Sequence, residues 1–151
     1  MVEYEIDSST LIIIGISLNE SKVITNEGEY KIKLSSTEIV DRTCKFFGSS
    51  LADRIKMTKR LANIAVKSPI IVEEIRNILF FPLKSTREKN NIWVSFNNIE
   101  KYDKEDDETI VYFKGGKSVK LNCSYYIFDN QVTRSLILDY EHQKRLKSLQ
   151  K

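Results

Sequence analysis

Few side chains in this sequence are of the types that carry out catalysis. An enzyme needs a nucleophile with a base, a paired acid and base, or a metal site. The sole histidine is His142, which lies among charged residues near the C-terminus, and we expect it to be a surface residue at a helix end. Gly115 and Gly116 lack the spacing of a phosphate-binding loop and indicate a hairpin turn instead. These observations favour a protein that is not an enzyme.

An acidic run is the one candidate for a metal site. It consists of Asp103, Glu105, Asp106, Asp107 and Glu108. The run lacks the glycine and the distal glutamate of a calcium loop. We expect it to be a solvated connection between two strands, with no metal and no cofactor. A metal-dependent nucleic-acid enzyme stays open as an alternative.

The net charge is +3, and its distribution along the chain is uneven. Residues 1–41 carry three basic and eight acidic side chains (3 − 8 = −5), whereas residues 42–101 carry twelve and five (12 − 5 = +7). Most of this excess lies between Arg42 and Lys67, where Asp53 is the single acid. Clustered cations release the counterions condensed on nucleic acid, so the pattern suits phosphate binding. A solvated basic face without a ligand fits the charge pattern equally well.

A second basic segment, residues 84–91, separates two apolar runs. Its hydroxyl, amide and cationic groups are those that contact phosphates and base edges. A loop of this kind can reach into a groove while the flanking strands hold it in place. Taken alone, an ordinary surface loop explains the segment as well.

The N-terminal third predicts a small antiparallel meander followed by a helix. Strands are expected over residues 11–18, 22–25 and 29–34, the last with period-two alternation. Ser35 and Glu38 form a capping-box pattern, apolar residues then recur at helical spacing, and Gly48 supplies a stop. Residues 49–66 fit either a second helix capped by Ser50 or Asp53, or an ordered basic loop.

The remainder predicts short strands and a final helix. Strands are expected over residues 70–72, 78–81 and 92–96, with a hairpin over 109–113 and 118–121. Val132, Leu136 and Tyr140 lie four apart in a C-terminal amphipathic helix over residues 130–149. The prediction is an α+β fold: a single antiparallel β-rich domain over residues 1–151, with an internal amphipathic helix and a C-terminal helix.

The cysteines and the apolar runs indicate the compartment. Cys44 and Cys123 lie far apart without metal-type spacing, so buried thiols are expected rather than a disulfide. No stretch has the pattern of a signal peptide or the length of a membrane span. We expect a cytoplasmic protein with no membrane partner.

Several long phrases resemble the ComK family of competence transcription factors from Gram-positive bacteria. They are "GSSLADRIKMTKRLANIAVKSPIIV" (48–72), "FFPLKSTREKNNIWVS" (80–95), "VYFKGGKSVKL" (111–121) and "SYYIFDNQVTRSLILDY" (124–140). They occur in the family's order and at similar spacing. The likeness runs from about Leu11 almost to the C-terminus.

The resemblance implies a DNA-binding activator of genes for DNA uptake and recombination. The family binds double-stranded DNA as a multimer, at paired A/T-rich boxes (AAAA and TTTT), mainly through the minor groove. The resemblance further implies RNA polymerase as a partner, and capture by a MecA-type adaptor for a Clp protease. Such a protein would act at the nucleoid.

The expected DNA-binding residues follow from charge placement. They are Arg54, Lys56, Lys59, Arg60, Lys67, Lys84, Arg87, Lys89, Asn90 and Arg134. We assign Arg87 and Lys84 to the groove, because a narrow A/T minor groove attracts inserted cations. Arg54, Lys56, Lys59 and Arg60 are assigned to phosphates. Arg134 fits a structural ion pair equally well.

A β-rich adaptor that docks an acidic protein or an anionic membrane through the same face is the alternative function.

Overall fold

The structure, a computed structural model that describes residues 3–150, has the α+β fold expected from the sequence. Two antiparallel sheets and three helices make it up. The elements are β1 Thr10–Ser17, β2 Glu20–Thr25, β3 Glu29–Ile32, α1 Ser36–Phe46, α2 Leu51–Ala62, β4 Ile70–Glu73, β5 Ile78–Pro82, β6 Ile92–Ser95, β7 Ile99–Glu105, β8 Glu108–Phe113, β9 Ser118–Leu121 and α3 Tyr125–Ser148. No helix within the described residues is long and apolar enough to cross a membrane.

The larger sheet has six strands in the order β3-β2-β1-β6-β5-β4, and every neighbouring pair is antiparallel. The predicted N-terminal meander forms its first half, and the three predicted central strands form the other half. The smaller sheet, β7-β8-β9, contains the predicted glycine hairpin. Strand β7 was not predicted. Part of the acidic run lies within it, so the expected connecting loop is confined to the turn at Asp106 and Asp107.

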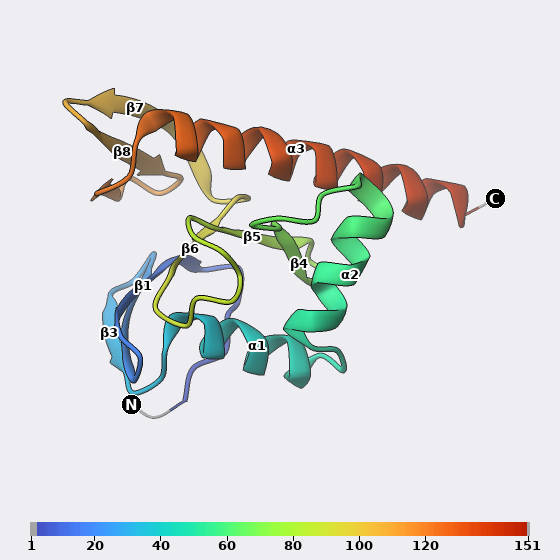
Figure 1. The fold of residues 1–151 in the computed structure, drawn as a ribbon, viewed down its shortest axis with the longest axis horizontal. Coiled ribbons are helices and arrows are strands. Elements are labelled where there is room, and N and C mark those ends of the chain that lie inside the picture. The colour runs from blue at the N-terminus through green and yellow to red at the C-terminus, as the bar shows by residue number, and fades with distance from the viewer. Residues whose placement is uncertain (1–2, 151) are drawn as a thin grey trace.

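Both faces of the six-stranded sheet are covered (Figure 1). On one face Ile13, Phe80 and Trp93 pack with the apolar side of α1 and the start of α2. The other face packs against the three-stranded sheet and the first half of α3, around Phe81 and Phe128. Alternate residues of the central strands therefore enter opposite cores, as the period-two geometry of a strand requires.

Helix α2 resolves the ambiguity over residues 49–66. Ser50 caps it, because its hydroxyl accepts a hydrogen bond from the Asp53 amide, and the helix ends at Asn63, which adopts a left-handed φ of 57°. The helix lies beside the edge strand β4 (Figure 1). Its last turns, with Met57 and Leu61, pack against a small core shared with α3.

Helix α3 begins earlier than predicted, and only part of the predicted apolar stripe belongs to its buried face. Ser124 caps the helix, and its first residue, Tyr125, lies five residues before the expected start at residue 130. Leu136 and Tyr140 are 53% and 65% exposed, whereas Phe128, Ser135 and Leu138 are buried. Val132, the first residue of the predicted stripe, is buried, so the prediction was wrong at Leu136 and Tyr140. The buried face of α3 includes polar side chains, which an apolar pattern cannot identify.

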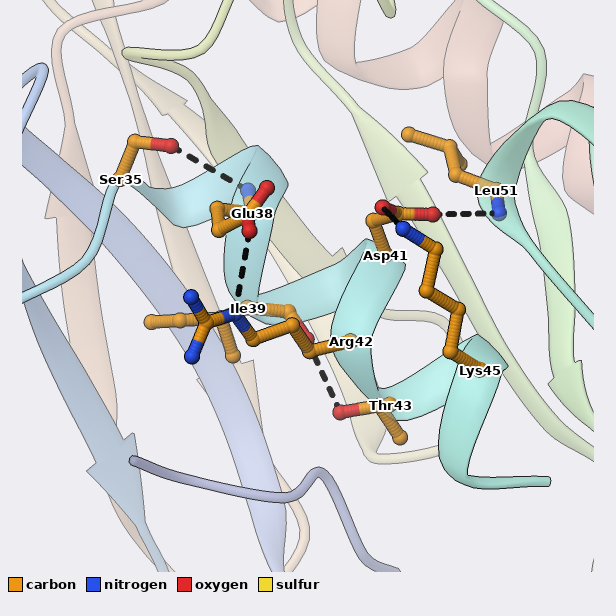
Figure 2. Close-up of polar contacts among 8 residues, drawn as sticks. All are labelled: Ser35, Glu38, Ile39, Asp41, Arg42, Thr43, Lys45 and Leu51. Atoms are coloured by element: carbon orange, nitrogen blue, oxygen red, sulfur yellow. Dashed lines mark hydrogen bonds and ion pairs between the residues drawn. The ribbon is translucent and has the colours of Figure 1, made fainter. Parts of the chain in front are cut away.

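The junction between α1 and α2 depends on Asp41. One carboxylate oxygen accepts a hydrogen bond of 2.9 Å from the amide of Leu51, the first residue of α2, and the other lies 3.0 Å from Lys45 Nζ (Figure 2). An unpaired amide at a helix start requires such an acceptor. Asp41 therefore fixes where α2 starts relative to α1.

We expect Asp41→Ala to lower the free energy of unfolding by about 1–2 kcal/mol, because the Leu51 amide loses its acceptor. Asp41→Asn, which keeps an acceptor, should lose less. Urea denaturation followed by circular dichroism measures both. The control is Arg42→Ala, which removes only an exposed pair with Glu38 and should change stability by less than about 0.5 kcal/mol. Equal losses for Asp41→Ala and Arg42→Ala would contradict this role.

Candidate nucleic-acid interface

The structure brings the two predicted basic segments together at one surface hollow. A cavity of about 530 Å³ lies between α2, the segment that follows it, and the 84–91 loop. Its lining includes Lys56, Lys67 and Arg87. The adjoining surface along α2 adds Lys59 and Arg60. We call these five residues the basic hollow.

Helical spacing places three of these cations on one side of α2. Lys59 and Arg60 lie three and four residues after Lys56, so their side chains project from the same side of the helix as Lys56. All three are exposed. Beyond the helix, Lys67 adopts a left-handed φ of 50°, which turns the chain toward β4. The segment that carries Lys67 therefore closes one side of the hollow.

The first turn of α1 holds the far end of the 84–91 loop. The Ser36 hydroxyl contacts the carbonyls of Lys89 and Asn91 at 3.0 and 2.7 Å and accepts the Asn91 amide at 2.9 Å. The Thr37 hydroxyl donates to the Glu88 carbonyl at 2.6 Å, and the Thr37 amide donates to the Lys89 carbonyl at 3.2 Å. The loop is thus fixed to the helix and not only to its flanking strands.

Asn91 closes the loop on itself. Its buried side chain accepts the Lys84 amide at 3.0 Å and donates to the carbonyls of Lys84 and Ser85. Next to it, a Cβ at Gly15 would lie 2.2 Å from the Asn90 side chain and 2.8 Å from the Asn91 carbonyl. Gly15 is therefore required for the close approach of this loop to β1. Neither role was predicted from the sequence.

Most of the predicted cations are unpaired. Within residues 3–150, no ion pair to a carboxylate is formed by Lys56, Lys59, Arg60, Lys67, Lys84, Arg87 or Lys89. Arg42 and Lys45, by contrast, pair with Glu38 and Asp41 on α1 (Figure 2). Fewer residues of the 42–67 segment therefore carry an unpaired positive charge than the sequence indicates. Lys84, Lys89 and Asn90 lie on the same loop as Arg87 but outside the lining of the hollow.

Arg54 is not part of the exposed group. Its side chain projects from the buried side of α2, and a guanidinium nitrogen donates to a Glu74 carboxylate oxygen at 2.8 Å. This hydrogen bond and the charge of Arg54 hold the pKa of Glu74 below its usual range. Arg54 therefore joins α2 to the β4–β5 turn instead of facing outward with Lys56 and Lys59.

Arg134 also serves the fold, although its partners are not acidic. Its guanidinium donates to the carbonyls of Val66 and Lys67 and to the Gln131 side chain. Gln131 in turn donates to the carbonyls of Lys67 and Pro82 at 2.9 and 2.6 Å. Together these two residues of α3 hold the wall of the basic hollow that carries Lys67.

The structure corrects one expectation about reactive groups. His142 is only 3% exposed and lies 3.9 Å from Glu74, so it is not a surface residue. Cys44 and Cys123 are free thiols, as expected, and burial raises the pKa of both, that of Cys44 to about 12. Within residues 3–150, no three His, Cys, Asp or Glu side chains are grouped to hold a metal ion.

Comparisons with known proteins agree with the earlier resemblance. The sequence model of the family described as "ComK protein" matches residues 1–147. The "Competence transcription factor" of Bacillus subtilis (strain 168) is 33% identical over 147 residues, which cover 95% of this chain and 77% of that relative. No solved structure matches the chain.

The Arg54–Glu74 pair makes stability depend on acidity. Because the pKa of Glu74 is lowered in the fold, the pair stabilises the protein above the pKa of an unfolded glutamate, about 4.3, and this contribution is lost as the pH falls through the lower folded pKa. We expect Glu74→Gln to cost about 1 kcal/mol at neutral pH, since half of Glu74 is exposed and screened. The difference from wild type should shrink below about pH 4.

Urea denaturation of both proteins between neutral pH and about pH 3 measures this difference. Glu38→Gln is the control, because Glu38 forms an exposed pair with Arg42 and the carboxylate faces no buried cation. A difference between wild type and Glu74→Gln that stays constant across the acidic range would show that the pair has no such effect.

Proposed function

The chain belongs to the ComK family of competence transcription factors, and we propose that it activates genes for DNA uptake and recombination by binding A/T-rich duplex DNA through the basic hollow. The family consists of DNA-binding activators and not of enzymes. The single observation that supports this surface is that two basic segments far apart in the sequence meet there with their cations unpaired.

The chemistry of the hollow suits a DNA backbone. Lys56, Lys59 and Arg60 form a row along α2, and cations in a row can neutralise successive phosphates and release their counterions. Because these side chains are exposed and have no carboxylate partners, no internal ion pair must be broken when DNA binds. We assign them to the phosphates.

Arg87 suits the minor groove. It lies at the exposed tip of a loop whose other end is fixed by α1, so the guanidinium can be inserted without the backbone becoming disordered. A/T-rich sequences narrow the minor groove and concentrate its negative potential, which attracts arginine. We assign Arg87, assisted by Lys84 on the same loop, to this groove, with Lys89 and Asn90 alongside.

The roles of the other predicted residues are revised by their contacts. Lys67 contributes charge from the wall of the hollow. Arg54 and Arg134 support the interface from within, by holding α2 and the Val66–Lys67 segment. We propose indirect effects on DNA binding for these two, instead of direct contacts.

The proposed compartment, DNA sequence and partners rest on family membership alone. We propose that the protein works in the cytoplasm at the nucleoid, binds paired AAAA and TTTT boxes as a multimer and recruits RNA polymerase. Capture by a MecA-type adaptor for a Clp protease would then set its abundance. These partners follow from family membership and not from a surface described above.

The decisive experiment is a fluorescence anisotropy titration of duplexes that carry A/T boxes or a G/C-rich replacement, at several salt concentrations. We expect tighter binding to the A/T boxes. The logarithm of the affinity should fall with the logarithm of salt concentration with a slope of about −3 to −4 per chain, because three cations of α2, with Lys67 beside them, neutralise phosphates. Equal affinity for both duplexes would exclude sequence-directed activation. An absence of salt dependence would exclude the hollow as the binding surface.

Variants separate the two roles of the cations. Arg87→Ala should lower the preference for A/T boxes by about 1–2 kcal/mol, because the inserted guanidinium is lost. Lys59→Ala should weaken binding to both duplexes about equally and reduce the salt slope by about one. Lys104→Ala removes an exposed cation from β7 in the smaller sheet and is the matched control, with binding unchanged. If Arg87→Ala kept the full A/T preference, the groove assignment would be wrong.

A further inference from the structure

A second cavity lies where the last turns of α2 and α3 meet. Its volume is about 190 Å³, which suits a small organic group. Met57 and Leu61 from α2 and Leu146 and Leu149 from α3 give it apolar walls. Met57 and Leu61 also pack against the core shared by the two helices, so this wall is supported from behind. An apolar group in the cavity would be shielded from water.

The rim of this cavity is positively charged. Arg60 and Arg145 are exposed at its edge, and neither forms an ion pair within residues 3–150. Glu74 also lines the cavity, and one oxygen of its carboxylate accepts a hydrogen bond of 2.8 Å from Arg54, which offsets its charge. Two unpaired guanidiniums at one opening favour a carboxylate, which they bind with paired N–H groups.

The inner side of the cavity contains a buried imidazole without a hydrogen bond, 3.9 Å from the Glu74 carboxylate. His142 is nine-tenths buried or more, and within the described residues neither of its ring nitrogens forms a hydrogen bond. A buried polar atom without a partner is costly, and it requires an explanation such as an unseen water or ligand. A divalent cation at His142 and Glu74 is disfavoured, because Arg54, Arg60 and Arg145 surround the position.

We propose that this cavity binds a small organic carboxylate with a short apolar body, seated between Leu61 and Leu146 with its charge at Arg60 and Arg145. The apolar walls fit the apolar body, the cationic rim fits the carboxylate, and the volume limits the size of the ligand. An acidic ion without an apolar body would meet the rim but leave the walls empty. The proposal concerns the protein without DNA and does not depend on the DNA-binding function.

The test uses 4-methylpentanoate as the probe, with the full chain labelled for ¹H–¹⁵N NMR at constant ionic strength. We expect saturable shifts at Arg60, Leu61, His142 and Leu146, with a dissociation constant of about 1–10 mM, as befits so small a ligand. Acetate lacks the apolar body and 4-methylpentan-1-ol lacks the charge. Each should bind at least about fivefold more weakly.

A matched pair of variants tests the rim. Arg145→Gln should weaken 4-methylpentanoate binding about fivefold to tenfold, because one guanidinium is lost. Lys144→Gln makes the same change of charge at the neighbouring residue, which does not line the cavity, and should change binding less than about twofold. Both residues are exposed, so both variants are expected to fold.

Three results would overturn the proposal. The first is the absence of saturable shifts around the cavity with 4-methylpentanoate. The second is binding of the alcohol or acetate as tightly as the probe, which would remove the need for a combined site. The third is an equal loss in Arg145→Gln and Lys144→Gln, which would show attraction to the general charge of α3.

Discussion

The hydrogen bonds between the first turn of α1 and the end of the 84–91 loop are the constraint on which the candidate interface depends. Ser36 and Thr37 use their side-chain hydroxyls on the carbonyls of residues 88, 89 and 91. The Thr37 hydroxyl also accepts the indole N–H of the buried Trp93 at 3.0 Å. The loop that carries Arg87 is therefore connected to the centre of the core, and its position follows that of α1.

Helix α2 and the segment after it are held in place by side chains that do not face the basic hollow. Asp41 fixes its start, Arg54 ties its middle to Glu74, and the segment after it is held by Gln131 and Arg134. Arg54 is buried against Glu74, and the Arg134 guanidinium is used on the carbonyls of Val66 and Lys67, so both arginines serve the fold. The cations that remain free lie on the outer side of α2, opposite the buried face. Arg54 and Arg134 thus hold the interface together, and the exposed cations stay available to a ligand.

The sequence predicted elements where local signals agree with packing. Ser35, Ser50 and Gly48 mark helix boundaries by local chemistry alone, and short apolar runs located most strands of the larger sheet. Strand β7 has polar and charged residues on both faces, so no alternation distinguished it from a loop. In α3 the buried face includes Gln131, Ser135 and His142, so the apolar stripe through Leu136 and Tyr140 selected the wrong side. Burial of Arg54 depends on Glu74, twenty residues away, which no local pattern encodes.

Arg60 belongs to two surfaces, the basic hollow and the cavity between α2 and α3. One guanidinium cannot give the same donors to a phosphate and to a carboxylate at once. If each proposed ligand uses Arg60, binding of one must weaken binding of the other by the same factor, because coupling between two sites is reciprocal. The effect would be modest, since Arg60 is one of five cations in the hollow and the other four would remain available to DNA. The cavity would then adjust affinity for DNA without acting as an on–off switch, and the adjustment would arise from the position of Arg60 near the end of α2.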